Sequence, residues 1–272
     1  MAETNDMEEH AILTRRLGAV FIIEINRPQA KNAVNSPTAR RLAAAFQEFD
    51  ADDTLRVAVF HGANGSFCAG ADLKHVSQAD FQTPRLELPI DTMDGTAPMG
   101  PSYMRPSKPV IGAIAGYAVA GGLELSLICD FRVVEETAIF GVYCRRWGVP
   151  LIDGGTVRLP RIIGMGNAMD MILTGRPVDA QEAKQMGLAN RIVPEGAALA
   201  EAIEIAEQMA RFPQKCMLSD RQSAYQQWSL PFEEAMQNEN RLGHEVIASG
   251  ETRSGATRFA QGKGRGGSFD DI

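Results

Sequence analysis

An acid placed just after a glycine pair is the first feature of this 272-residue chain that could do chemistry. Gly121 and Gly122 are followed by Leu123 and Glu124, and an apolar run continues as far as Cys129. This pattern predicts a tight turn that leads into a buried helix over 121–129. Because a buried carboxyl group without a partner is costly, Glu124 is a candidate for proton transfer. The alternative is a first-turn acid that only favours the helix dipole.

A second small-residue turn has the same relation to a strand. The segment SFCAGADL, residues 66–73, follows a β-branched and aromatic run at 57–60, and the glycine pair follows a similar run at 109–114. Open α/β sheets bind ligands at the carboxyl ends of their parallel strands. Two such turns side by side could aim two backbone N–H groups at one oxygen, an oxyanion hole worth about 3–4 kcal/mol per donor. The alternative is that both turns serve packing only.

The surrounding pattern alternates strands and helices up to about residue 140. Strands are predicted at 11–15, 19–26, 57–60, 109–114, 131–134 and 138–140, and helices at 38–50, with Ser36 as its N-cap, and at 121–129. This alternation predicts an α/β fold with a mainly parallel sheet. The stretch 78–106 has no period and is predicted to be a lid or a wall of the substrate pocket.

Helices dominate the rest of the chain. They are predicted at 156–163, 167–173, 180–186, 196–211, 214–228, 231–249 and 252–262, with one strand at 191–193. The pattern divides the chain into an α/β core, 1–193, and a C-terminal helical region, 194–272. Because these last helices cannot all pack on one sheet, we expect the C-terminal region to serve self-association.

Composition excludes several classes of function. A net charge of −7 gives no basic surface for nucleic acid or an anionic membrane. No apolar run approaches the roughly 20 residues of a membrane span. The acidic N-terminus is unlike a targeting segment, and four separated cysteines are typical of reduced thiols, which favours a cytoplasmic protein. The scattered histidines and cysteines predict no metal site.

Several motifs in order resemble the crotonase superfamily, and within it the enoyl-CoA hydratases and isomerases. They are NRPQAKNA, FCAGADL, GYAVAGGLELSLICD, FGV, GGTVRLPRIIG and LTGRPVDAQEAKQMGLAN. The resemblance implies a spiral of repeated ββα units with a C-terminal helical region that trimerises and closes the CoA site. It implies an acyl-CoA or enoyl-CoA substrate, no cofactor besides the CoA of that substrate, and a homotrimer or a dimer of trimers.

The resemblance also assigns catalytic roles by motif. The backbone N–H groups of Ala71 and Gly121 would stabilise the thioester oxyanion, and Glu124 would be the first of the two glutamates of a hydratase. Cys144 stands where the second glutamate is expected, and a thiol is a poor substitute because its usual pKa is about 8.5. Asp153 is the candidate for a second acid; alternatively, it is a turn residue that caps the glycines or the helix after it.

The remaining roles implied by the resemblance concern CoA binding. Its candidate residues are Ala30 and Lys31 at the nucleotide end, Ala69, Gly70, Asp72 and Leu73 along the channel, Lys74 near a phosphate, and Phe259 and Lys263 at the C-terminal closure. For the last two the alternative is ordinary packing and a solvated lysine. Arg145 and Arg146 would contact a substrate anion or, alternatively, form salt bridges.

These motifs favour hydration of a 2-enoyl-CoA as the reaction. The missing second glutamate leaves double-bond isomerisation, thioester hydrolysis and decarboxylation as alternatives on the same scaffold. A non-catalytic acyl-CoA-binding protein is the alternative from another class.

Overall fold

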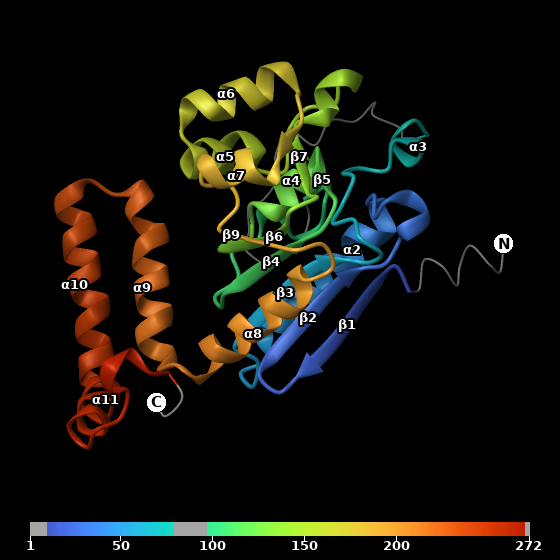
Figure 1. Ribbon diagram of the computed structural model, residues 1–272. Helices are drawn as coiled ribbons and strands as arrows, with labels where there is room; N and C mark the ends of the chain where they lie inside the picture. The colour runs from blue at the N-terminus through green and yellow to red at the C-terminus, as the bar shows by residue number, and fades with distance from the viewer. Residues whose placement is uncertain (1–9, 79–96, 270–272) are drawn as a thin grey trace. The chain divides into compact units, whose positions relative to one another are not determined.

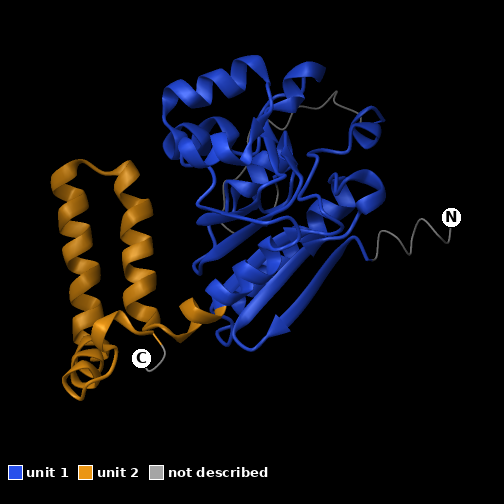
Figure 2. Ribbon diagram, in the orientation of Figure 1, with its two compact units in different colours: residues 1–206 blue, residues 207–272 orange. Residues whose placement is uncertain are grey.

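The computed structural model describes residues 10–78 and 97–269, which form two compact units, 1–206 and 207–272 (Figures 1 and 2). The larger part of the predicted lid, residues 79–96, lies outside the described residues. The division between the units falls inside helix α8 (Ala198–Arg211), whereas the boundary expected from the sequence, after residue 193, precedes this helix.

A six-stranded sheet forms the centre of unit 1 (Figure 1). Its order is β1 (Ile12–Leu17), β2 (Val20–Ile25), β3 (Val57–Gly62), β4 (Val110–Ile114), β6 (Phe131–Glu135) and β9 (Arg191–Val193). Only β1 and β2 pair antiparallel, so the predicted, mainly parallel sheet is confirmed. All residues of β3 are buried, as expected for a continuous apolar run covered on both faces.

A second, smaller sheet lies beside α4 and consists of β5 (Tyr117–Val119), β7 (Ile139–Gly141) and β8 (Val178–Asp179). The strands predicted at 131–134 and 138–140 both form, but they belong to different sheets because the chain leaves the large sheet after β6. Strands β5 and β8 were not predicted, since two or three residues are too few to reveal a period of two.

The helices of unit 1 largely follow the predicted pattern. They are α2 (Ser36–Ala51), α3 (Leu73–Val76), α4 (Gly121–Ser126), α5 (Gly155–Ile163), α6 (Met165–Thr174) and α7 (Ala180–Gln185), with short 3-10 turns η1 (Pro28–Ala30), η2 (Pro101–Tyr103) and η3 (Tyr143–Trp147). Helix α4 ends at Ser126, before the predicted end at Cys129. The N–H group of Asp130, which would continue the helix by bonding to Ser126 O, donates instead to Val110 O of β4 at 2.8 Å. The buried guanidinium of Arg132 donates to the carbonyl oxygens of Ser126 and Cys129, at 3.2 and 3.1 Å.

Helix α2 packs its apolar face on β1 and β2. Its N-cap is Asn35, whose side chain accepts from Thr38 N at 3.0 Å, so the predicted N-cap, Ser36, is instead the first helical residue. Phe46 on this helix meets Phe60 of β3 edge to face, with ring centroids 5.4 Å apart. This contact anchors β3, whose carboxyl end leads to the first small-residue turn.

Unit 2 contains the predicted helices of the C-terminal region: α9 (Gln214–Gln226), α10 (Phe232–Ala248) and α11 (Glu251–Ala260), with turns η4 (Gln227–Ser229) and η5 (Arg265–Gly267). Helices α9 and α10 lie side by side (Figure 2). Among the described residues, no helix is both long and apolar enough to span a bilayer.

Candidate active site

The two small-residue turns predicted from the sequence are in direct contact. Cys68 N donates to Tyr117 O at 2.8 Å, and Val119 N donates to Cys68 O at 3.1 Å, so β5 runs alongside the first turn. A Cβ atom on Gly122 would lie 2.0 Å from Cys68 O, which only a glycine avoids. The short strand β5 therefore brings the turn after β3 against the start of α4.

The backbone of Gly70 lies against that of Gly121. A Cβ atom on Gly70 would lie 3.0 Å from Gly121 N and 2.9 Å from the Cβ atom of Ala120. Gly70 has a φ of +97°, and Ala120 has a φ of +53°, which is uncommon for a residue with a side chain. Such a conformation costs of order 1–3 kcal/mol and persists only where the surroundings impose it.

The backbone amides of Ala71 and Gly121 lie at this junction. Over residues 10–78 and 97–269, neither Ala71 N nor Gly121 N donates a hydrogen bond within the protein. Gly121 is the first residue of α4, where N–H groups have no intrahelical acceptor. Beside Ala71, the bridge to Val34 uses Gly70 O and Asp72 N instead. Both amides remain available to a ligand oxygen, and their role as oxyanion donors stays a prediction.

Glu124 is buried in helix α4, three residues after Gly121, and its carboxylate is held by two N–H groups. Its Oε1 accepts from Asp153 N at 2.9 Å and from Gly155 N at 2.8 Å, and its exposed fraction is 2%. Burial and then the charge of Asp153 raise the pKa of Glu124 to about 7, although both backbone hydrogen bonds act to lower it. A carboxyl group with this pKa can take up and return a proton near neutral pH.

Asp153 is equally buried, and its side chain points to a different segment. Its Oδ1 accepts from Met99 N at 2.9 Å and from Ser102 Oγ. Burial raises the pKa of Asp153, while these two hydrogen bonds oppose the rise. Among the described residues, the Asp153 side chain accepts from Met99 and Ser102 and from no N–H group of helix α5, which argues against its capping this helix. The alternative of a turn residue beside Gly154 and Gly155 is not tested by these contacts. The role of Asp153 as second acid stays a prediction.

The segment around η2 belongs to the stretch 78–106, which the sequence predicted to be a lid or a wall of the substrate pocket, but its contacts with the loop around Asp153 were not predicted. Besides the bonds of Met99 and Ser102 to Asp153, Tyr103 Oη donates to Ile152 O at 2.6 Å. The sulfur of Met99 also lies 2.8 Å from where a Cβ atom on Gly121 would be. This segment therefore supports both the amide turn and the loop that holds Glu124. Its sequence has no period, and nothing in it signals these contacts.

The segment that carries Cys144 supplies no carboxyl group. The thiol of Cys144 is buried, and burial and then the charge of Glu124 raise its pKa, so it is neutral at neutral pH. Arg145 Nε donates to Ile172 O at 3.0 Å, and the guanidinium of Arg146 lies 4.1 Å from the ring centroid of Tyr143. Both arginines therefore have partners within unit 1.

The CoA-binding candidates of unit 1 form one surface strip. Ala69 N donates to Lys31 O at 3.0 Å, and Val34 N donates to Gly70 O at 2.8 Å, so the loop after β2 runs beside the turn after β3. Asp72 accepts from the N–H groups that open α3 and also pairs with Arg27 at 3.0 Å. The strip comprises Ala30, Lys31, Ala69, Gly70, Asp72, Leu73 and Lys74, of which Lys31, Leu73 and Lys74 are exposed.

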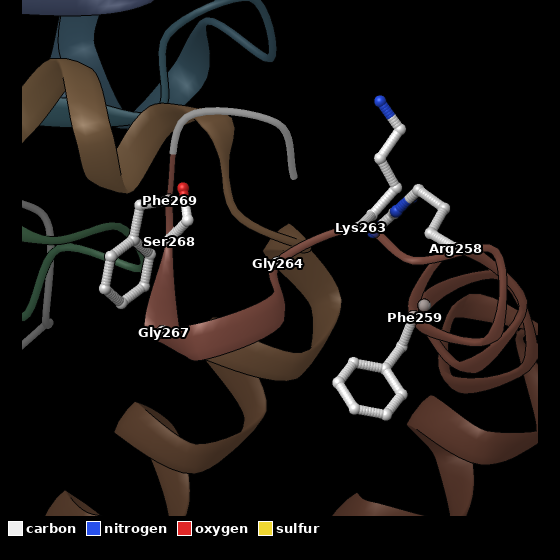
Figure 3. Close-up of a pocket in the computed structure, with 8 residues that line it drawn as sticks. Arg258, Phe259, Lys263, Gly264, Gly267, Ser268 and Phe269 are labelled. Carbon is white, nitrogen blue, oxygen red and sulfur yellow. The ribbon is translucent and has the colours of Figure 1, made fainter.

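Phe259 and Lys263 lie together in unit 2. They line a surface pocket of about 240 Å³ with Arg258, Gly264 and Phe269, among others (Figure 3). Phe259 is 63% exposed, and its role in CoA binding stays a prediction. An exposed aromatic ring beside two basic side chains is suited to a ligand that carries both a planar base and phosphate.

No three His, Cys, Asp or Glu side chains gather to hold a metal ion anywhere in 10–78 or 97–269.

Comparisons with known proteins agree with this architecture. Crystal structures of enoyl-CoA hydratases from Mycobacterium marinum and Mycobacterium tuberculosis superpose with TM-scores of 0.83 and 0.84, at 32% and 33% identity. Each comparison covers 92% of this chain and 96% of the other. The fold is thus that of the crotonase superfamily, as the motifs implied.

Sequence comparison narrows the class further. Residues 15–265 match the family described as enoyl-CoA hydratase/isomerase. A probable enoyl-CoA hydratase of Rhizobium meliloti is 36% identical over 253 residues, 93% of this chain and 96% of that protein. Enoyl-CoA hydratase EchA19 of Mycobacterium tuberculosis is 35% identical over 92% of this chain and 93% of its own length. The chain belongs to the enoyl-CoA hydratase/isomerase family.

Proposed function

We propose that this protein hydrates a 2-enoyl-CoA thioester and uses Glu124 as its acid/base. The observation that carries the proposal is a buried carboxyl group with a pKa of about 7 in the helix that begins at one of two contacting turns. Within the described part of the chain, the N–H groups of Ala71 and Gly121 in these turns donate no hydrogen bond. Relatives that match over nearly their whole length are named for the same reaction.

The reaction follows from these groups. The thioester oxygen accepts from Ala71 N and Gly121 N, which draws electron density from the β-carbon and stabilises the enolate that forms. Ionised Glu124 takes a proton from the water whose oxygen bonds to the β-carbon. The enolate then takes a proton at its α-carbon, so the elements of one water are added across the double bond.

Because Cys144 stands where the second glutamate is expected, the motif does not assign the group that donates the proton to the α-carbon. We propose Asp153 as the second acid, because it is the second buried carboxyl group of the site and its raised pKa favours holding a proton. Glu124 returning its own proton is the alternative, and it needs no second acid.

Isomerisation is the second candidate reaction. A single carboxyl group that moves a proton between two carbons is sufficient for it, and the presence of Cys144 at the position of the second glutamate favours this possibility. The same two amides would stabilise the dienolate. Hydrolysis, decarboxylation and non-catalytic acyl-CoA binding are weaker alternatives.

We further propose how the substrate is held. In unit 1, Ala30 and Lys31 lie at the nucleotide end of CoA and the residues from Ala69 to Lys74 line its channel. In unit 2, Phe259 and Lys263 are further candidates for a contact with CoA. CoA enters as part of the substrate, with no separate cofactor. The C-terminal helical region, 194–272, would support a cytoplasmic homotrimer or a dimer of trimers.

A panel of CoA thioesters with mass detection tests the reaction. Purified protein is expected to add one water to crotonyl-CoA or a longer 2-enoyl-CoA, and Glu124→Gln is expected to lower kcat by about a hundredfold or more. A product of unchanged mass with a moved double bond would assign isomerisation. Binding of the thioesters without turnover of any of them would assign a binding protein and overturn the proposal.

A further inference from the structure

We infer that Glu124, Asp153 and Arg158 form one electrostatic triad, in which the two carboxyl groups compete for one proton and Arg158 favours their ionised forms. This inference rests on the proposed role of Glu124 and deepens it, since it names the residues that set the pH at which that role is possible. Arg158 is a positioning residue in this scheme, because it acts through its neighbours.

The two carboxyl groups belong to one buried cluster. Glu124 and Asp153 have exposed fractions of 2% and 4%, and Asp153 N lies 2.9 Å from Glu124 Oε1. A carboxylate in such surroundings has lost most of its hydration, and a second carboxylate nearby adds repulsion. Two acids opposite one arginine carry an excess negative charge, which one bound proton neutralises.

Arg158 is fixed to the turn that holds Glu124. Its backbone N donates to Gly154 O at 2.8 Å in the first turn of α5, and its Nη1 donates to Asp153 O at 3.3 Å. The same Nη1 would lie 2.3 Å from a Cβ atom on Gly154, so a side chain at position 154 would displace the guanidinium. Gly154 also has a φ of +93°, a second reason for glycine here.

The charges act on Glu124 in opposite directions. After burial, the charge of Asp153 is the largest influence that raises the pKa of Glu124, whereas the charge of Arg158 lowers it. Arg158 lowers the pKa of Asp153 as well. The other titratable groups that interact with Glu124 are Cys144 of η3 and Tyr103 of η2. Both have raised pKa values and are therefore neutral near pH 7.

Direct titration of Glu124 tests the triad without reference to activity. The full-length protein is labelled with ¹³C at the glutamate side-chain carboxyl, and the Glu124 signal is assigned by its loss in Glu124→Gln. Asp153→Asn keeps an acceptor oxygen for Met99 N and Ser102 Oγ but removes the charge. We expect it to lower the pKa of Glu124 by about one unit. Arg158→Met is expected to raise it.

Two further variants control for structural disturbance. Arg161→Met removes the same charge from an exposed position of the same helix, and it is expected to leave the titration of Glu124 unchanged. Arg158→Lys keeps the charge and is expected to restore most of the wild-type value. The acid limb of the kcat profile should move with the measured pKa in each variant.

The possible outcomes distinguish a failure of the triad from a failure of the proposed reaction. If Asp153→Asn and Arg158→Met shift the titration in the same direction, or no more than Arg161→Met does, the triad is wrong even if the protein hydrates enoyl-CoA. If the shifts are opposite as expected but no thioester is turned over, the triad is supported and the proposed reaction fails.

Discussion

Asp153 holds Glu124 with its backbone and a different segment with its side chain. Its N–H group donates to Glu124 Oε1 at 2.9 Å, while its carboxylate accepts from Met99 N and Ser102 Oγ. One residue thus joins the acid/base to the segment around η2, which in turn packs against Gly121 through the side chain of Met99. A substitution in the segment around η2 is therefore expected to affect both the Glu124 carboxyl group and the turn at Gly121.

The hydroxyl of Ser102 is the first place to test this connection. Ser102→Ala leaves the buried Asp153 carboxylate with one donor fewer, which we expect to cost about 1–3 kcal/mol of unfolding free energy and to lower kcat. Urea unfolding and steady-state rates measure both effects. Ser107→Ala is the matched control, because its hydroxyl donates to Asp50 at an exposed position. Equal losses in the two variants would contradict the connection.

Gly155 tests the close approach of backbone to Glu124. A Cβ atom there would lie 2.9 Å from Oε1 and 3.0 Å from Cγ of Glu124, so Gly155→Ala must displace the carboxyl group. We expect kcat to fall at least about tenfold, because small displacements of a reacting group are costly. Gly166→Ala, in α6 with nothing within 4 Å of the new Cβ atom, should keep full activity and gain up to about 1 kcal/mol. The idea fails if Gly155→Ala is as active as Gly166→Ala.

The pKa of Glu124 also predicts how stability depends on pH. The folded protein binds this proton more tightly than the unfolded chain, with a pKa of about 7 against 4.5. The folded state is therefore penalised as pH rises through this window, by roughly 3 kcal/mol above it. Glu124→Gln removes the penalty, so it should equal wild type in stability at pH 4 and exceed it at pH 8. A difference that is the same at both pH values, measured by chemical denaturation, would refute this.

Substitutions of Asp153 and of Cys144 test which residue is the second acid, because different effects on kcat are expected. If Asp153 donates the α-proton, Asp153→Asn should lower kcat at least tenfold across the pH range, whereas Cys144→Ala should change it little. Steady-state hydration rates over pH 6–9 distinguish a missing acid from a shifted acid limb. Loss of activity in Cys144→Ala but not in Asp153→Asn would reverse the assignment.

Local sequence pattern was sufficient for much of the fold. Continuous apolar runs predicted β3 and β4, and helical spacing predicted α2 and the helices of unit 2, because each signal is confined to one element. The same local reasoning selected Glu124, since an acid inside an apolar run stands out in the sequence alone. It did not reveal β5, although β5 is the strand that brings the two turns together.

Only the tertiary structure determined which groups surround Glu124. The side chain of Asp153 reaches Met99 and Ser102, which are more than 50 positions away in the chain, and no periodic pattern connects them. The raised pKa of Glu124 likewise arises from burial and from the charges of Asp153 and Arg158. Residue types and spacing determine which groups are present, whereas desolvation and through-space charge depend on distances that exist only after the chain has folded.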